Sequence, residues 1–244
     1  MNIMKNKFSF MIIVVATLLA SFSLKAANTC LDFDGTDDFV QSDNTVIPAS
    51  GDFTVSVWAK LDGLPTSGVR EILSQDAGSG GEDFYIGYEN GIVRAGDDWV
   101  GNTGVSYPTD GEWHFFTVVK NSTNTFLYID GELKATKGST SLNPAGDIFR
   151  VARQYGVYPE YFDGQIDEVR IWNTARTEQE ITDNMNHQLT GSETGLVSYY
   201  NFNEGSGDIA GDSVGDNYGS LLYFYRYWSR INWSFLFFRF LGRL

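Results

Sequence analysis

The residues best suited to chemistry are carboxylates that stand in short clusters with glycine. One cluster runs from Asp32 to Asp38 around Gly35, and a second is Gly96-Asp97-Asp98. Calcium takes about six to eight hard oxygen ligands, which loops of this composition can supply. The competing interpretation is that these acids form turns and keep the surface soluble. Both interpretations place the clusters in loops, and calcium is the metal that they would suit.

No arrangement of side chains for nucleophilic catalysis is found. The two histidines, His114 and His187, have no paired cysteine or serine motif, and no Gly-x-Ser-x-Gly elbow exists. His114 lies inside an apolar strand, where a structural or surface role is expected. The sequence therefore predicts a protein that is not an enzyme.

The charge distribution narrows the choice of partners. The formal net charge is −14, and all 31 acidic residues lie between Ala27 and Ser220, where only 10 basic residues give a net charge of −21. Nucleic acids and anionic membrane surfaces attract Lys and Arg, so neither is an expected partner.

The N-terminal segment is predicted to be a signal peptide, residues 1–26. Lys5 and Lys7 precede an apolar run from Phe8 to Leu24, which is shorter than a membrane span requires. We expect a secreted or cell-surface protein whose mature part does not insert into a membrane. Cys30 is the only cysteine, so the core must hold the fold without an intramolecular disulfide.

Strand signals dominate the elements that must position these residues. Residues 53–61 alternate strictly, with Phe53 and Leu61 at the ends of one apolar face and Trp58 on the opposite face, toward solvent or a ligand. Hairpins are predicted at residues 89–91, 121–124 and 130–131. The pattern predicts an all-β, two-sheet antiparallel β-sandwich (jelly roll).

One short C-terminal helix and a changed C-terminal composition complete the organisation. Thr177 and Glu180 have the spacing of a capping box, and the helix is expected to pack across a sandwich edge. The sandwich is predicted to cover residues 27–203. Residues 204–244 are expected to be a linker and an atypical tail of aromatic residues and arginine, outside any folded domain.

Several segments together resemble the laminin-G-like jelly-roll family of the concanavalin A-like lectin and glucanase superfamily, in its secreted bacterial form. The resemblance covers about residues 31–186 and rests on the segments 31–40, 53–58, 113–119, 127–131, 162–173 and 177–181. It implies the jelly-roll fold. It implies little about function, because this fold hosts lectins, adhesins, enzymes and spacers.

The resemblance also implies a structural calcium ion between the N-terminal segment and the closing strand. The ligands would be Asp34 and Asp167, with backbone carbonyls near Gly51 and Asp52. The alternative is that Asp167 hydrogen-bonds to backbone amides of the first turn.

The glucanases of this superfamily carry three carboxylates on one strand face, and this chain departs from that pattern. At the matching segment Gln165 cannot act as an acid, and alternation predicts opposite faces for Asp167 and Glu168. A glycoside hydrolase is therefore the least favoured reading of the fold.

Exposed aromatic residues on loops are the expected sugar platforms, because a pyranose ring stacks on them while polar groups bind its hydroxyls. The predicted ligand-binding residues are Trp99, Asn102, Tyr155, Tyr158 and Tyr161. The alternative is that they cover the rim of the core; Trp58 and Trp172 are expected to be packing residues. The expected function is a non-catalytic module that binds a polysaccharide or glycoprotein, and the alternative is a structural or adhesive spacer.

Overall fold

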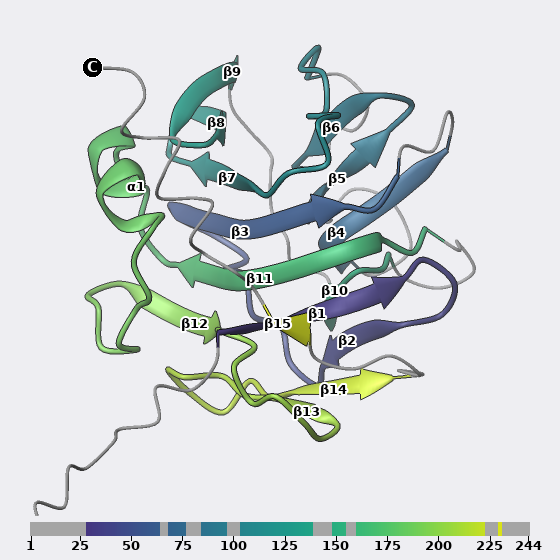
Figure 1. The fold of residues 1–244 in the computed structure, drawn as a ribbon. Coiled ribbons are helices and arrows are strands. Elements are labelled where there is room, and N and C mark those ends of the chain that lie inside the picture. The colour runs from purple at the N-terminus through teal and green to yellow at the C-terminus, as the bar shows by residue number, and fades with distance from the viewer. Residues whose placement is uncertain are drawn as a thin grey trace, which may run out of the picture.

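The computed structural model describes residues 28–63, 68–76, 84–96, 103–138, 148–154, 160–222 and 229–230. Its strands form two antiparallel sheets that pack face to face, and one short helix lies outside them (Figure 1). The predicted all-β sandwich with one short helix is confirmed.

The two sheets are named sheet 1 and sheet 2. Sheet 1 has the order β15 (Ser229–Arg230), β1 (Thr29–Asp34), β11 (Asp163–Trp172), β3 (Phe53–Leu61), β7 (His114–Lys120), β8 (Asn124–Ile129) and β9 (Glu132–Gly138), and β12 (Leu196–Tyr200) also pairs with β11. Sheet 2 has the order β13 (Ile209–Ala210), β14 (Gly219–Leu222), β2 (Phe39–Ser42), β10 (Ile148–Val151), β4 (Val69–Asp76), β5 (Phe84–Glu89) and β6 (Ile92–Ala95).

The main core lies between the sheets, and strand β3 shows how the sequence builds it. Phe53, Val55, Val57, Ala59 and Leu61 all belong to this core, as the alternation predicts. The opposite face of β3 is also buried, because helix α1 (Glu178–Asn184) and the residues after it cover it. The prediction that this face meets solvent or a ligand is therefore wrong.

Trp58 anchors the helix to this outer face of sheet 1. Its side chain packs against Ile181 and Met185, and its indole N–H donates to the carbonyl of Met185 at 2.9 Å. The predicted capping box is present, with Thr177 and Glu180 exchanging hydrogen bonds between side chain and backbone. The helix therefore packs on the outer face of sheet 1, over β3, β7 and β8, and not across an edge of the sandwich as predicted.

Two of the predicted hairpins have turn residues with positive φ. Asn90 and Gly91 join β5 to β6 with φ of 48° and 90°, and Asp130 and Gly131 join β8 to β9 with φ of 55° and 79°. A tight two-residue hairpin requires positive φ at both positions, which Asn-Gly and Asp-Gly tolerate. Residues 121–123 connect β7 to β8.

The sandwich extends beyond the predicted boundary at residue 203. Strand β14 pairs with β2, β13 pairs with β14, and Ala210 and Leu221 join the main core. The Gly- and Asp-rich composition between these short strands resembles a linker, although it forms turns within the sheet. Beyond Leu222 only the backbone of β15 is described, and it pairs with β1.

The predicted signal peptide, residues 1–26, lies outside the described residues. Among the residues that are described, no helix has the length and apolar character needed to span a bilayer.

Candidate cation site and binding surfaces

Three aspartates meet at the turn between β1 and β2, at one end of the sandwich. A carboxylate oxygen of each of Asp34, Asp37 and Asp38 lies within 4.8 Å of the others. The turn is tight because Gly35 adopts φ of 70° against β11, where a Cβ atom would stand 2.7 Å from the Cβ of Asp163. The local sequence thus folds the three carboxylates onto one point.

Asp38 is the buried member of this cluster, which we call the aspartate turn. Its side chain is 1% exposed; Oδ2 accepts the Asp34 amide at 3.3 Å, and Oδ1 has no partner among the described residues. Burial raises the pKa of Asp38 to about 6, with further contributions from Asp34, Asp37 and Asp32. Three carboxylates with one unpartnered buried oxygen fit a hard cation such as calcium.

The metal ligands implied by the family resemblance do not form one site. Asp34 stands opposite Asp163, so Asp167 lies four residues further along β11, about 13 Å away at about 3.3 Å per residue. Asp52 precedes β3 at the end opposite Leu61, whereas the Asp34 end of the sheet lies beside Leu61. The strand register therefore excludes a common ion for Asp34, Asp52 and Asp167.

Only Asp34 of the predicted metal ligands belongs to the aspartate turn. The acidic cluster of residues 32–38 is predicted as a whole to suit calcium, but Asp37 and Asp38 are not named among the ligands. Their signal was available, since both lie in the first acidic cluster of the sequence. The ligand set implied by the family resemblance included Asp167 on the closing strand in place of Asp37 and Asp38.

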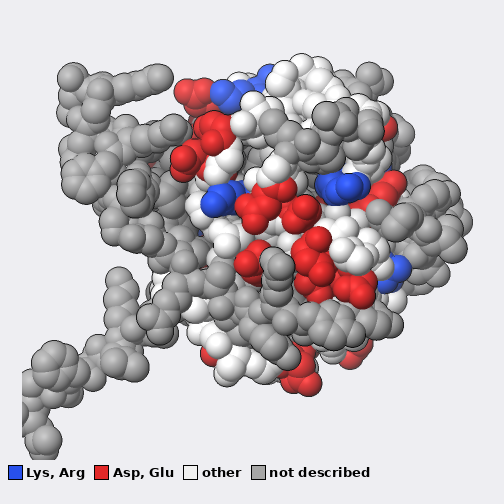
Figure 2. Space-filling model, turned by 45° about the vertical axis from the view of Figure 1, so that its right-hand side comes forward, with Lys and Arg blue, Asp and Glu red and all other residues white. Residues whose placement is uncertain are grey.

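The acidic character continues along this end of the molecule. Asp163 and Asp62 adjoin each other, with the Asp62 amide donating to the Asp163 carbonyl at 2.9 Å. Burial raises the pKa of Asp163, and Asp62, Asp34 and Asp32 add to the effect against the opposing charge of Arg70. Figure 2, in which the right-hand side of Figure 1 comes forward, shows Asp and Glu side chains gathered on this face.

Of the predicted ligand-binding residues, Tyr161 alone lies within the described part of the chain; Trp99, Asn102, Tyr155 and Tyr158 lie outside it. Tyr161 is half-buried on the outer side of sheet 2. The Arg153 guanidinium lies 5.1 Å from its ring centroid and 4.5 Å from that of Phe39. The two rings are 6.2 Å apart, so they form an aromatic pair around one arginine.

An ion-pair network lies beside this aromatic pair on the same sheet. Glu71 is fully buried and forms a salt bridge with Arg94, whose guanidinium also reaches Glu160 at 3.2 Å. The Arg94 guanidinium stacks over Tyr85, 4.9 Å from the ring centroid. The outer side of sheet 2 therefore combines aromatic rings with fixed charges.

Two carboxylates of β11, Asp167 and Glu168, are buried, and Asp167 Oδ2 has no hydrogen-bond partner among the described residues. Ile166 and Val169 both face the core, so two residues, Asp167 and Glu168, stand between consecutive core positions. A bulge at this point, with φ of 54° at Glu168, breaks the alternation used to predict opposite faces. Asp167 is fully buried and Glu168 is 4% exposed, so neither faces an open cleft.

Asp167 lies inside this bulge, where its surroundings favour the protonated, neutral carboxyl group. Burial raises its pKa well above the ordinary value, and the adjacent Glu168 adds to the shift. Its Oδ1 accepts the backbone amide of Glu168 at 2.9 Å. The alternative prediction was that Asp167 accepts hydrogen bonds from backbone amides of the first turn. The amide that it accepts instead belongs to Glu168, in its own bulge.

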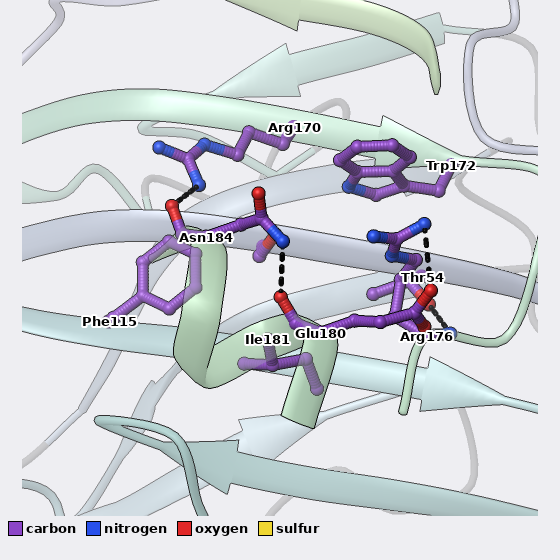
Figure 3. Close-up of a pocket in the computed structure, with 9 residues that line it drawn as sticks. Thr54, Phe115, Arg170, Trp172, Arg176, Glu180, Ile181 and Asn184 are labelled. Atoms are coloured by element: carbon purple, nitrogen blue, oxygen red, sulfur yellow. Dashed lines mark hydrogen bonds and ion pairs between the residues drawn. The ribbon is translucent and has the colours of Figure 1, made fainter. Parts of the chain in front are cut away.

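A small cavity lies beneath α1 on the outer face of sheet 1 (Figure 3). Its volume is about 20 Å³, which is room for a single water. Arg170 crosses its edge to donate to the Asn184 carbonyl at 2.9 Å, and the Arg176 guanidinium lies 4.4 Å from the Trp172 ring centroid. The cavity is part of the packing of the helix and is too small for a ligand.

Comparison with known proteins gives a family and several solved structures of similar fold. A proposed carbohydrate-binding protein from Bacteroides ovatus ATCC 8483 superposes with a TM-score of 0.62 at 20% identity, covering 81% of this chain and 58% of that protein. A heptameric SAP-like pentraxin from Limulus polyphemus gives 0.47 at 14% identity, covering 64% of this chain and 81% of the pentraxin.

Domain 4 of AbnA, an extracellular arabinanase from Geobacillus stearothermophilus solved with arabinotriose, gives 0.42 at 22% identity, covering 58% of this chain and 66% of that domain. No curated protein matches the sequence. At 20% identity the likeness to the Bacteroides ovatus protein shows the fold alone. The family model described as the concanavalin A-like lectin/glucanases superfamily matches residues 34–182, more than half of the chain, so the chain belongs to this laminin-G-like family.

Proposed function

We propose that this protein is a secreted or cell-surface, non-catalytic module that binds a carbohydrate or glycoprotein and holds calcium at the aspartate turn. The observation that carries the binding role is the half-buried Tyr161 on the outer side of sheet 2, whose ring is held in place by the buried Phe39 and by Arg153. Rings offer a stacking face for a pyranose, and neighbouring charged groups bind its hydroxyls. The carbohydrate-binding assignment of the Bacteroides ovatus protein is consistent with this role.

The burial of Asp167 and Glu168 on β11 supports a non-catalytic role. Retaining hydrolysis needs two carboxyl groups about 5 Å apart that flank the substrate. Asp167 and Glu168 are both buried, and Glu168 is bound by Arg170 and Tyr199. Neither is placed to reach a glycosidic bond.

A glycan array of the chain, with and without calcium, tests the binding role. We expect retention of at least one polysaccharide or glycoprotein glycan, weakened by Tyr161→Ala and by Trp99→Ala while the melting temperature stays close to that of the parent. A matched control is Tyr218→Ala, because Tyr218 is 51% exposed and precedes Gly219, which pairs with Ser42 at the end of β2 opposite Phe39. A blank array from a folded protein would favour the spacer role, and release of reducing sugar from a glycan would favour a hydrolase.

Thermal melting with calcium and in calcium-free buffer tests the ion. An ion at about one hundred times its dissociation constant adds about 2.7 kcal/mol to the unfolding free energy. For a domain of this size the melting temperature should rise by about 5–10 °C. An unchanged midpoint would remove calcium from the proposal and leave the glycan result unaffected.

A further inference from the structure

A second hollow, which shares no lining residue with the aromatic pair, lies where β3 ends and the chain leads into β7. Its volume is about 240 Å³, and it is lined by Leu61, Gly63 and residues 107–112. Sites for drug-sized ligands occupy about 300–1,000 Å³, so this hollow has room for a single small ring.

One side of the hollow is held by contacts with the β5–β6 hairpin. The Tyr107 amide donates to the Gly91 carbonyl at 2.9 Å, and Ser106 pairs with Ile92. The Tyr107 ring stacks on Phe116, with centroids 5.2 Å apart and planes at 25°. This wall is therefore fixed to the core before any ligand arrives.

The other side of the hollow is held by hydrogen bonds that link Asp110, His114 and Asp130. Asp110 Oδ1 accepts the Glu112 amide at 3.1 Å and contacts His114 Nε2 at 2.9 Å, while His114 Nδ1 contacts Asp130 at 2.7 Å. Burial opposes the charged imidazole, but the hydrogen bonds to Asp130 and Asp110 outweigh it and raise the pKa of His114. A loop tied at both ends loses little entropy when it binds a ligand.

The lining combines an apolar base with an acidic rim. Leu61, Tyr107 and Pro108 supply apolar surface, and Asp110 and Glu112 supply exposed carboxylates. None of these lining residues is basic. Carboxylates accept hydrogen bonds from hydroxyl and ammonium groups, and they repel anions.

Acidic residues next to the hollow strengthen its preference for cations over anions. Asp62 lies between the lining residues Leu61 and Gly63, and it adjoins Asp163 and the acidic face shown in Figure 2. Carboxylates that line a cleft concentrate cations and exclude anions over a distance of about 10 Å.

We propose that this hollow is a second binding site that takes one sugar residue without negative charge, and that it prefers a protonated amino sugar. The site is independent of the aromatic pair, so it stands even if the proposed glycan binding at Tyr161 fails. A single ring with few contacts should bind with a dissociation constant on the order of 1 mM.

The test uses three probes that share one ring and differ in charge: glucosamine, glucose and glucuronate. Binding to the full chain is followed at low salt by amide chemical shifts of residues 61–63, 107 and 109–112. We expect affinity to fall from glucosamine to glucose to glucuronate, and the glucosamine affinity to fall with added salt.

Matched variants separate this site from general electrostatics. Glu112→Gln should weaken glucosamine binding by about two- to five-fold at low salt and leave glucose binding nearly unchanged. Glu178→Gln removes the same charge from α1, and Tyr161→Ala removes the aromatic pair; neither should alter glucosamine binding. Shifts absent from residues 107–112, or equal affinities for glucosamine and glucuronate, would overturn the proposal.

Discussion

Two buried carboxylates in this molecule, Glu168 and Asp38, have opposite charge environments. Glu168, on the outer face of sheet 1, accepts the Arg170 guanidinium at 2.6 Å and the Tyr199 hydroxyl at 2.6 Å. Asp38, at the aspartate turn, is surrounded by further aspartates, and within the described residues no Lys or Arg forms a salt bridge with Asp34, Asp37 or Asp38.

The difference distinguishes an acid that is paired within the chain from a candidate ligand for a cation. A buried charge needs a partner, and Glu168 finds its partner within the chain. The aspartate turn concentrates negative charge and leaves a buried oxygen of Asp38 without a partner in the part of the chain described. Such an arrangement is stabilised by a proton or by a cation from solution.

The largest expected effect is the loss of the internal partner. Arg170→Met leaves Glu168 buried without its guanidinium and also removes donors to the carbonyls of Asn184 and His187. Removal of one partner of a buried pair costs about 3–5 kcal/mol, so the unfolding free energy in urea should fall by that amount.

Two further variants decide whether charge causes this loss. Glu168→Gln combined with Arg170→Met removes both charges and should recover part of the stability. Arg176→Met is the control, because Arg176 pairs at 3.4 Å with the more exposed Glu180 and should cost less than about 1 kcal/mol. A double variant no more stable than Arg170→Met would attribute the loss to packing and contradict the contrast drawn here.

The second largest effect is expected for Asp38→Asn at the aspartate turn, whose melting temperature should change in opposite directions without and with calcium. Asp38→Asn removes a repelled buried charge, so in calcium-free buffer at pH 7.5 its melting temperature should equal or exceed that of the parent. With calcium the order reverses, because the variant loses a ligand and with it most of the expected gain of about 5–10 °C.

Asp183→Asn in the helix is the control for Asp38→Asn, since it removes one charge far from the turn. It should leave the calcium response intact. Equal calcium responses in the parent and in Asp38→Asn would refute an ion at this position.

The pH dependence should differ between the metal-free and calcium-bound states. The pKa of Asp38 is raised from 3.8 to about 6, so between these values the folded protein binds more protons than the unfolded chain. The contribution of Asp38 to stability therefore rises as the pH falls from above 6 toward 4 in calcium-free buffer. With calcium the trend should reverse, because protons compete with the ion; melting curves across this range that run parallel in both buffers would contradict the site.

Features set by local sequence were predicted well. The alternation of residues 53–61, the Asn90-Gly91 and Asp130-Gly131 turns and the Thr177 cap each depend on neighbours within a few residues. Periodicity and turn chemistry carry that information in the sequence.

Features set by strand register and bulges were not predictable in the same way. The distance between Asp34 and Asp167 depends on which residue of β11 faces β1, and one bulge at Glu168 changes the side on which a carboxylate lies. Strands β13 and β14 were missed because only the pairing of β14 with β2, and of β13 with β14, gives them a place in the sheet. Such non-local contacts leave no periodic signal in the segments that make them.

The smallest expected effect concerns helix α1, which lies over the buried pair of Glu168 and Arg170. Thr177→Ala removes the cap of α1 and should cost about 1 kcal/mol, which lowers the melting temperature by about 2–4 °C. Thr182→Ala is the matched control, since the Thr182 hydroxyl donates only to the Glu178 carbonyl within the helix and its loss should stay within about 0.5 kcal/mol. If Thr177→Ala lowers the unfolding free energy as much as Arg170→Met does, the helix stabilises the Glu168 and Arg170 pair mainly by excluding water from it. If the loss stays near about 1 kcal/mol, the ion pair itself is the main source of that stability.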